Sequence, residues 1–272
     1  MKAIVNTAAC AMYKAPSREN TVEDEALFGM TVDILDEPAP GWFHIRTHYR
    51  YEGIVSADEL ITDEALVSRW EALPKKVILH KNCCDVLSVP KVQGWHMAHL
   101  VRGSLVAPLG EPENGWQKVC IPDGREGWVY AGVLGEHYTA PLSDDEDTLR
   151  KALVETVQLY VGTHYRWGGK SPLGIDCSGL CSMAYMLCGI LIYRDARIVE
   201  GFPIREIPLS EMKPGDLIFF PGHVAMYLGE GRYCHSTARA GADGVTYNSL
   251  DPDAPDYRAD LKEKITAVGS YF

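Results

Sequence analysis

The sequence has no long hydrophobic run, and its acidic residues outnumber its basic ones. No apolar stretch approaches the roughly 18 residues that a membrane-spanning helix needs, so no membrane partner is expected. Lys and Arg together number 26 against 37 Asp and Glu, which gives a net charge of −11. An acidic chain repels the phosphate backbone of nucleic acids, so a nucleic-acid partner is not expected either.

The N-terminal segment also lacks the pattern of a secretion signal, because polar residues interrupt it before a long apolar block has formed. Eight cysteines would suit a disulfide-rich secreted protein only if the chain were small and carried such a signal. We therefore expect a cytoplasmic protein whose cysteines are mostly free thiols. The 272 residues, 46% hydrophobic and 23% charged, predict two or three globular domains and give no indication of an oligomeric state.

The first half of the chain repeats itself at an offset of 74 residues. Both copies alternate polar and apolar residues in short runs that Gly, Pro and Asp interrupt, a pattern typical of small antiparallel strands. The matching pairs follow one another without a gap. They include Gly29 with Gly103, Val32 with Val106, Pro38 with Pro112, Trp42 with Trp116, Glu52 with Glu126 and Gly53 with Gly127.

These copies resemble bacterial SH3 (SH3b) modules, in which a Gly-Trp pair is followed by a Gly-[Trp/Tyr]-[Ile/Val] motif. The resemblance implies a small β-barrel for each copy, at residues 1–65 and 66–142. His96 and His99 are close in the second copy, but no Glu or further His or Cys stands at a ligand spacing beside them. No metal site is therefore expected.

A third domain is expected over residues 143–272. Ser143 is followed three residues later by Glu146, the pattern of a capping box at the start of a helix. Apolar residues then recur at helical spacing, at Leu149, Leu153 and Val157. The pattern predicts a helix at the start of this domain.

Cys177 stands where local structure would activate a nucleophile. A glycine-bearing loop at 168–174 leads into the segment Asp-Cys-Ser-Gly, after which apolar residues recur every three to four positions. This spacing predicts a buried helix that begins at Cys177 or just after it. A thiol in the first turn of a helix lies beside free backbone N–H groups and the positive end of the helix dipole, and both lower its pKa. Such a thiol also needs a base.

Two histidines downstream of Cys177 are candidates for that base. Turn and strand signals predict three consecutive strands between residues 217 and 236. His223 and His235 then lie on either side of a hairpin, and if they pair across it their side chains face the same side. One imidazole would take the thiol proton while the other fixes the orientation of the first ring.

Two sequence blocks around these residues, YRWGGKSPLGIDCSGL and PGDLIFFPGHVAMYLG followed by YCHS, resemble the NlpC/P60 family of cell-wall cysteine peptidases over roughly residues 146–272. The resemblance implies an α+β, papain-like domain in which a helix carrying the cysteine packs against an antiparallel sheet carrying the histidine. It implies Cys177 as the nucleophile, His223 as the base and His235 as the polar third residue. It also places the Tyr165 hydroxyl near the oxyanion position. It implies hydrolysis of amide bonds in peptidoglycan peptides, commonly after γ-D-glutamate, without a cofactor.

Two SH3b-like copies without a secretion signal narrow this resemblance to γ-D-glutamyl-L-diamino acid endopeptidases of the dipeptidyl-peptidase VI type, which recycle murein peptides. The implied substrate is a murein tripeptide or tetrapeptide with a free N-terminal L-Ala, and the implied product is L-Ala-γ-D-Glu. The diamino acid is diaminopimelate or Lys. Asp176 and Ser178, which flank Cys177, are expected to hold the dipeptide beside it.

The remaining substrate-binding residues implied by this resemblance come from two domains. At the positions of Glu25 and Tyr51 in the first copy, the second copy has His99 and Arg125. The resemblance joins an acid and a tyrosine of this kind to a peptidase-domain acid, for which Asp195 is the candidate. Three such groups would bind a free α-ammonium through charge-assisted hydrogen bonds.

Other functions are compatible with the same motifs. An exported peptidoglycan hydrolase would use the SH3b-like copies as anchors on intact wall, and binding to purified sacculi would distinguish it. A non-catalytic wall-binding protein with a degenerate peptidase domain is disfavoured because Cys177, His223 and His235 are all present. Amidases and acyltransferases of related folds share a Cys/His pair, but often in another order along the chain.

Overall fold

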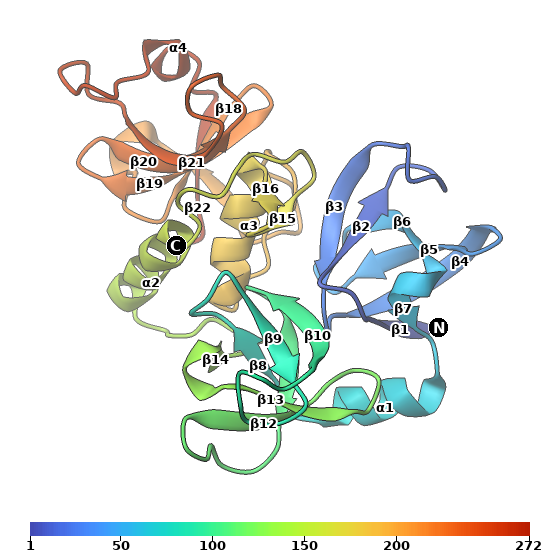
Figure 1. The fold of residues 1–272 in the computed structure, drawn as a ribbon. Coiled ribbons are helices and arrows are strands. Elements are labelled where there is room, and N and C mark those ends of the chain that lie inside the picture. Colours follow the sequence, from blue (N-terminus) through green and yellow to red (C-terminus); the bar gives the residue numbers. More distant parts are fainter. The chain divides into compact units, whose positions relative to one another are not determined.

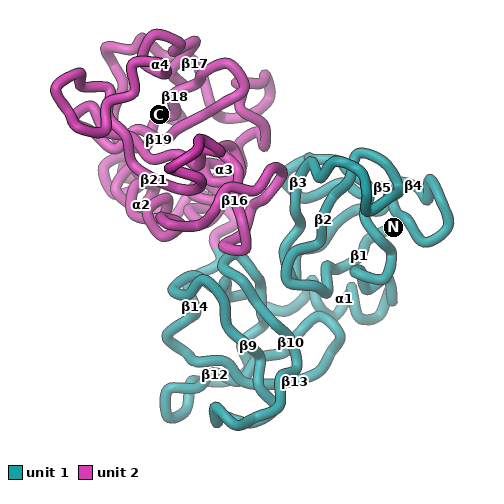
Figure 2. Tube along the Cα trace, turned by 45° about the horizontal axis from the view of Figure 1, so that its top comes forward, with its two compact units in different colours: residues 1–137 teal, residues 138–272 magenta.

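The computed structural model describes all 272 residues and divides into two compact units, residues 1–137 and 138–272. Figure 2 shows them in teal and magenta. The division lies ahead of the boundary predicted at residue 142. Antiparallel sheets dominate both units, and helices pack beside the sheet of the second. The α+β class is therefore confirmed in its general form.

The first unit begins with a seven-stranded antiparallel sheet (Figure 1). Its strands are β1 (Lys2–Val5), β2 (Ala9–Tyr13), β3 (Val22–Leu27), β4 (Thr31–Ala39), β5 (Trp42–Thr47), β6 (Glu52–Ser56) and β7 (Leu60–Ile61). They are hydrogen-bonded in the order β3-β2-β6-β5-β4-β1-β7. A short 3₁₀ turn, Ala57–Glu59, precedes the last strand.

A second sheet with the same connectivity follows in the same unit. Its strands are β8 (Lys76–Ile78), β9 (Cys83–Leu87), β10 (His96–Val101), β11 (Leu105–Pro108), β12 (Trp116–Cys120), β13 (Glu126–Tyr130) and β14 (Leu134–Glu136). Their order, β10-β9-β13-β12-β11-β8-β14, equals that of the first sheet with every strand number raised by seven. The internal repeat is thus confirmed. In neither sheet do the two end strands pair with each other, so closed barrels are not confirmed.

Two equivalent glycines show why the copies share their framework residues. A Cβ atom added to Gly53 would lie 2.9 Å from the Cβ of Met12, and one added to Gly127 would lie 2.5 Å from Cγ1 of Val86. Each pair matches the other at the offset of 74 residues. Because no side chain fits at either position, glycine allows the strand that carries it to pack closely against its neighbour.

Helix α1 (Glu64–Ala72) connects the two sheets. The Asp63 side chain caps it by accepting a hydrogen bond from the backbone of Leu66. The buried Trp70 anchors the helix, because its indole N–H donates to the carbonyl of Gly29 at 2.9 Å. The boundary predicted between residues 65 and 66 falls inside this helix, so the copies are joined by a helix and not by a loop.

The second unit holds a six-stranded sheet with helices beside it (Figure 1). The sheet order is β17-β22-β18-β19-β20-β21, and α3 packs against both β19 and β20 as well as against α2. Its elements are α2 (Glu146–Gln158), β15 (Lys170–Ser171), β16 (Gly174–Ile175), α3 (Cys177–Leu187), β17 (Arg205–Ile207), β18 (Leu217–Phe220), β19 (His223–Gly229), β20 (Arg232–Thr237), β21 (Gly244–Ser249), α4 (Ala259–Lys262) and β22 (Ala267–Ser270). The three strands predicted between residues 217 and 236 are confirmed.

The predicted cap of α2 was wrong. The helix begins at Glu146, and Asp145 is its N-cap, because the carboxylate of Asp145 accepts the backbone N–H of Thr148 at 2.9 Å. Ser143 lies outside the helix, and its hydroxyl accepts the N–H of Asp145 at 3.1 Å instead. Asp145, two positions downstream, therefore caps the helix in place of Ser143.

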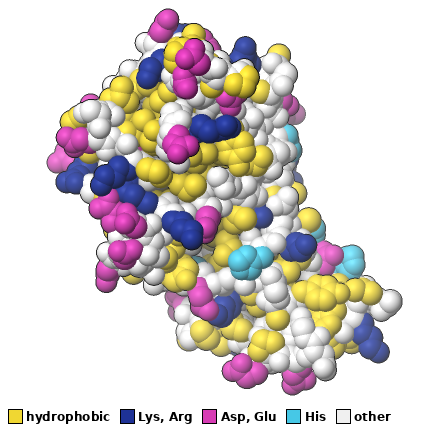
Figure 3. All heavy atoms as spheres, turned by 90° about the vertical axis from the view of Figure 1, so that its left-hand side faces the viewer, with side chains coloured by type: hydrophobic (Ala, Val, Ile, Leu, Met, Phe, Trp, Pro, Cys, Tyr) yellow, Lys and Arg dark blue, Asp and Glu magenta, His cyan; other side chains and the backbone are white.

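The surface carries charges of both signs. On the face drawn in Figure 3, acidic and basic side chains are interspersed with hydrophobic ones, and neither sign covers the face as one field. All eight cysteines are free. No helix of the structure combines the length and apolar character needed to cross a membrane.

Candidate active site

Cys177 is the first residue of α3, as predicted. Asp176 is the N-cap, and its carboxylate accepts the backbone N–H of Gly179 at 2.6 Å. The cysteine side chain is almost fully enclosed, since the residue is only 6% exposed. The thiol therefore lies at the positive end of a helix but with little access to water.

The pKa of this thiol differs from the sequence prediction. Burial raises the pKa of Cys177 to about 11, and the neighbouring Asp176 adds to the effect. The backbone N–H groups of Val224 and Ser178 act in the opposite direction but do not outweigh burial. The free-energy cost of removing water from the thiolate thus exceeds the stabilisation by the helix start, so the thiol is protonated at neutral pH. A protonated thiol can act as a nucleophile only if a base takes its proton.

His223 and His235 form a hydrogen-bonded pair, with Nε2 of His223 at 2.8 Å from Nδ1 of His235. Strand β19 carries the first and β20 the second. The register pairs Met226 with Cys234, which makes the two histidines diagonal neighbours on one face of the sheet. The prediction that they face the same side is confirmed. Val224, which follows His223, donates its backbone N–H toward the Cys177 sulfur, so the start of β19 lies next to Cys177.

Both imidazoles are neutral at neutral pH. Burial lowers the pKa of His223 to about 4, and the nearby Arg258 contributes to the decrease. Burial also lowers the pKa of His235 to about 3, with a further contribution from His223. A neutral His223 can accept a proton, so the site holds a protonated thiol beside an unprotonated base.

Tyr165 lies near Cys177. Its backbone forms an isolated bridge with Ile175, two residues before Cys177. Burial raises the pKa of the Tyr165 phenol to about 12, and Cys177 and Asp176 both add to this increase. The hydroxyl is therefore a neutral donor close to the Cys177 thiol, and its predicted role at the oxyanion position stays a prediction.

Asp176 and Ser178 belong to a buried network around Arg194, a residue that the sequence reasoning missed. The Arg194 guanidinium donates to both carboxylate oxygens of Asp176 at 3.0 Å and to the Ser178 hydroxyl at 2.8 Å. The backbone N–H of Gly168 also donates to Asp176, at 2.9 Å. Arg194 is 1% exposed, and breaking a buried pair of this kind costs about 3–5 kcal/mol. The network holds the segment around Cys177 in place, and substrate binding by Asp176 and Ser178 stays a prediction.

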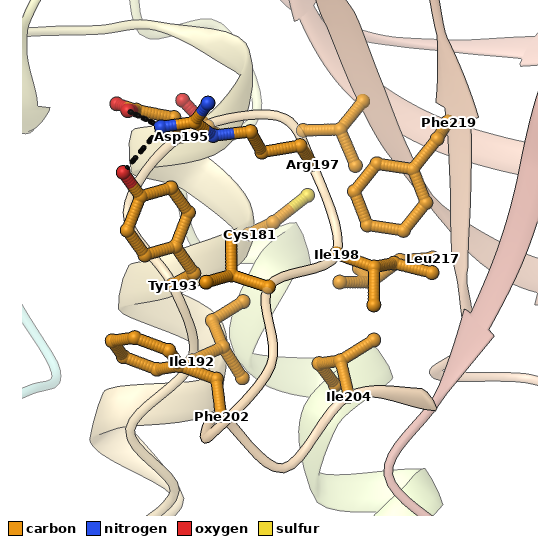
Figure 4. Close-up of a pocket in the computed structure, with 13 residues that line it drawn as sticks. Cys181, Ile192, Tyr193, Asp195, Arg197, Ile198, Phe202, Ile204, Leu217 and Phe219 are labelled. Atoms are coloured by element: carbon orange, nitrogen blue, oxygen red, sulfur yellow. Dashed lines mark hydrogen bonds and ion pairs between the residues drawn. The ribbon is translucent and has the colours of Figure 1, made fainter. Parts of the chain in front are cut away.

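A pocket (Figure 4) is lined in part by Ser178 and Val224, the residues that follow Cys177 and His223 in the chain. Figure 4 shows Asp195, Arg197 and Tyr193 along one edge, where Nη2 of Arg197 donates to the Tyr193 hydroxyl at 2.7 Å. Asp195 lies 3.9 Å from the same Arg197 nitrogen. The other walls are mostly apolar. The lining residues are Ser178, Cys181, Ile192, Tyr193, Asp195, Arg197, Ile198, Val199, Phe202, Ile204, Leu217, Phe219 and Val224.

Comparison with known proteins identifies the family. The profile described as "NlpC/P60 family" matches residues 162–259, which include Cys177, His223 and His235. The chain is 44% identical to "Dipeptidyl-peptidase 6" of Lysinibacillus sphaericus, and the match covers all of both chains. The chain belongs to the NlpC/P60 family. It is therefore a cysteine peptidase.

Further NlpC/P60 relatives differ more. A "Gamma-D-glutamyl-L-lysine dipeptidyl-peptidase" of Bacillus cereus is 26% identical over 80% of this chain and 68% of its own. A crystal structure of an NlpC/P60 family protein from Bacillus cereus ATCC 10987 superposes with a TM-score of 0.79 at 21% identity, covering 100% of this chain and 99% of that one. At that identity the likeness concerns the fold alone, and it agrees with a mixed α/β NlpC/P60 fold.

Glu25 and Tyr51, the predicted substrate-binding residues of the first copy, lie in unit 1 of this NlpC/P60 protein. Glu25 is a buried residue of β3, opposite Ala11 of β2. Tyr51 precedes β6, and its backbone N–H donates to the Thr47 hydroxyl at 3.1 Å. Their joint role with Asp195, which belongs to unit 2, stays a prediction.

A buried acid next to Glu25 escaped the sequence reasoning. Asp24 is fully buried and accepts a hydrogen bond of 2.6 Å from the Tyr49 hydroxyl. The same hydroxyl lies 3.3 Å from the backbone carbonyl of Glu25. This contact anchors the loop before Tyr51 to β3. The two residues are 25 positions apart, and an acid and a tyrosine at that separation form no recognisable sequence motif.

The neutral histidines of this NlpC/P60 site predict a pH-dependent stability. In the unfolded chain a histidine has its ordinary pKa of about 6.5 and gains a proton below it. Folded His223 and His235 stay unprotonated until about pH 4 and 3. The unfolded state therefore binds more protons in this window, and the free energy of unfolding is expected to fall as the pH decreases from about 6.5 to 4.

Urea unfolding at pH 7, 6, 5 and 4.5 measures this dependence. A His223→Gln/His235→Gln double variant should show a smaller decrease over the same range, because glutamine does not titrate. Equal decreases in the two proteins would mean that other groups carry the dependence.

Proposed function

We propose that this enzyme hydrolyses the γ-D-glutamyl–L-diamino acid bond of murein peptides and releases L-Ala-γ-D-Glu. The observation that carries the proposal is a buried Cys177 thiol beside the His223–His235 pair in a chain that matches "Dipeptidyl-peptidase 6" over its full length. Relatives described as "Gamma-D-glutamyl-L-lysine dipeptidyl-peptidase" support a γ-linked D-glutamyl substrate. The diamino acid is diaminopimelate or Lys.

The proposed reaction starts with proton transfer. Nε2 of His223 is engaged with His235, so Nδ1 is the atom left to take the thiol proton as Sγ attacks the γ-carbonyl carbon. The backbone N–H of Cys177 and the Tyr165 hydroxyl would donate to the developing oxyanion. His223 then gives its proton to the departing α-amine of the diamino acid. A water molecule, deprotonated by the same imidazole, hydrolyses the thioester and restores the thiol.

The substrate specificity that we propose involves both units. The two seven-stranded sheets would be SH3b-like modules. Recognition of the free α-ammonium of L-Ala would depend on Glu25 and Tyr51 of the first module and on Asp195 of the peptidase domain. A requirement for a free amine suits soluble peptides released from the wall, and we therefore propose a role in murein peptide recycling in the cytoplasm. Asp176 and Ser178 would contact the dipeptide through the edge of their network with Arg194.

Mass spectrometry of the products tests the proposal. Incubation with L-Ala-γ-D-Glu-diaminopimelate should yield L-Ala-γ-D-Glu and free diaminopimelate, and the corresponding Lys tripeptide establishes the preferred diamino acid. An intact tripeptide, or cleavage between L-Ala and D-Glu, would refute it. Purified sacculi serve as the comparison, because binding and cleavage of intact wall would favour an exported peptidoglycan hydrolase.

A further inference from the structure

The histidine pair continues into a third polar side chain, that of Asn248. Its amide oxygen Oδ1 lies 2.9 Å from Nε2 of the fully buried His235. Its amide nitrogen Nδ2 donates to the backbone carbonyl of Asp256 at 2.7 Å. Asn248 belongs to β21, which pairs with the strand that carries His235. The chain of contacts therefore runs from Asp256 through the amide and both imidazoles toward Cys177.

The carbonyl of Asp256 fixes which way the amide points. A carbonyl oxygen has no proton and can only accept. If the amide were reversed, Oδ1 of Asn248 would face that carbonyl and two acceptors would be in contact without a hydrogen. Nδ2 must therefore face Asp256, and Oδ1 must face His235.

This orientation sets the tautomer of each ring in turn. Oδ1 of Asn248 accepts, so Nε2 of His235 must carry the hydrogen. A neutral imidazole has one N–H, and His235 is neutral because burial lowers its pKa to about 3. Its Nδ1 is thus an acceptor, and the 2.8 Å contact requires the hydrogen on Nε2 of His223. The Nδ1 atom of His223 is then unprotonated.

We infer that Asn248 is a positioning residue that, acting through His235, holds His223 in the Nε2–H tautomer and so leaves Nδ1 free to take the thiol proton. The inference rests on the proposed roles of Cys177 and His223. It assigns to the amide a task that a carboxylate often has in hydrolytic triads, the selection of a tautomer. A neutral acceptor does this without placing a negative charge next to a buried imidazole.

The direct test is NMR of protein labelled with ¹⁵N-histidine. Long-range ¹H–¹⁵N correlations distinguish the two neutral tautomers, and both His223 and His235 should be in the Nε2–H form in the wild-type protein. In Asn248→Leu, which removes the acceptor, Nδ1–H forms should appear in both rings. The kcat for the tripeptide should fall by roughly 10- to 100-fold, less than the roughly 10²- to 10⁴-fold expected for loss of a general base.

Two further variants separate positioning from structural support. Asn248→Asp keeps an acceptor for Nε2 of His235 but loses the Nδ2 donor to the Asp256 carbonyl. It should therefore retain the wild-type tautomers and most of the activity, while its free energy of unfolding decreases. Tyr247→Phe changes the neighbouring residue of β21, whose side chain faces the other side of the sheet, and should leave tautomers and kcat unchanged. Should Asn248→Leu fail to fold, the wild-type and Asn248→Asp spectra still decide the question.

An Nδ1–H tautomer of His223 in the wild-type protein would overturn the inference, as would an Asn248→Leu variant with unchanged tautomers and kcat. The alkylation rate of Cys177 by iodoacetamide, followed by mass spectrometry of its peptide, should fall in Asn248→Leu and not in Asn248→Asp. Neither the spectra nor alkylation requires a murein peptide. A protein that has these properties but does not cut the tripeptide would refute the proposed function and leave the inference standing.

Discussion

Replacing Cys177 with alanine is expected to abolish hydrolysis of the tripeptide, because in the proposed reaction its sulfur forms the covalent bond to the γ-glutamyl carbonyl carbon. His223→Ala should lower the rate by roughly 10²- to 10⁴-fold, the usual contribution of a general base. His235→Ala should lower it less if that residue only orients His223. Steady-state release of L-Ala-γ-D-Glu measures all three.

A thiol mechanism that needs no metal predicts two further results. Iodoacetamide should inactivate the enzyme by modifying Cys177, and EDTA should leave the activity intact. The matched control is Cys188→Ala, which removes another buried thiol at the far end of α3 and should remain active. Activity in Cys177→Ala would disprove the assignment of the nucleophile, and a larger loss in His235→Ala than in His223→Ala would exchange the roles of the histidines.

Acetylation of the substrate N-terminus should lower kcat/KM by at least roughly 10²-fold, since a site built for a charged amine is left with unpaired polar groups when the amine is blocked. The comparison uses free and N-acetylated L-Ala-γ-D-Glu-diaminopimelate. Glu25→Ala, Tyr51→Phe and Asp195→Ala should each reduce kcat/KM for the free peptide. The difference in kcat/KM between the free and the acetylated peptide should become smaller.

The internal repeat supplies the control variants for this experiment. His99 and Arg125 of the second copy stand at the positions of Glu25 and Tyr51 in the first. His99→Ala and Arg125→Ala remove exposed side chains whose contacts with Asp85 and Asp123 contribute little to stability. Neither variant should change the ratio of kcat/KM between the free and the acetylated peptide. Equal cleavage of the free and acetylated peptides by the wild-type enzyme would refute the requirement for a free amine.

Local patterns were sufficient for much of the fold. The offset of 74 residues predicted two equivalent copies, and turn signals predicted the hairpin that carries His223 and His235, because both kinds of information are short-range. The start of α3 at Cys177 likewise follows from apolar spacing. The cap of α2 was misplaced because Ser143 and Asp145 are both good N-cap residues, and the choice between them depends on where the packed helix begins.

Other features of the site depend on tertiary packing and could not be predicted from the sequence. The pKa of the Cys177 thiol depends on burial by distant segments, so a rule based on the helix start gave the wrong direction. Arg194 reaches Asp176 across 18 residues, and Asn248 meets His235 across 13. Neither contact has a fixed spacing that a motif could encode. The one sequence signal for Arg194 was its position as a charged residue directly after the apolar run ILIY.

The buried ion pair between Arg194 and Asp176 also limits how the enzyme could be redesigned. The segment between α3 and β17 forms much of the pocket wall, which makes it the natural piece to exchange when a new specificity is sought. The same segment carries the cation that neutralises the carboxylate next to the nucleophile. A graft that alters the wall but omits this arginine would lose catalytic competence before selectivity could be measured. We therefore expect substrate recognition and reactivity to depend on the same segment, and libraries built on this scaffold should keep Arg194 constant.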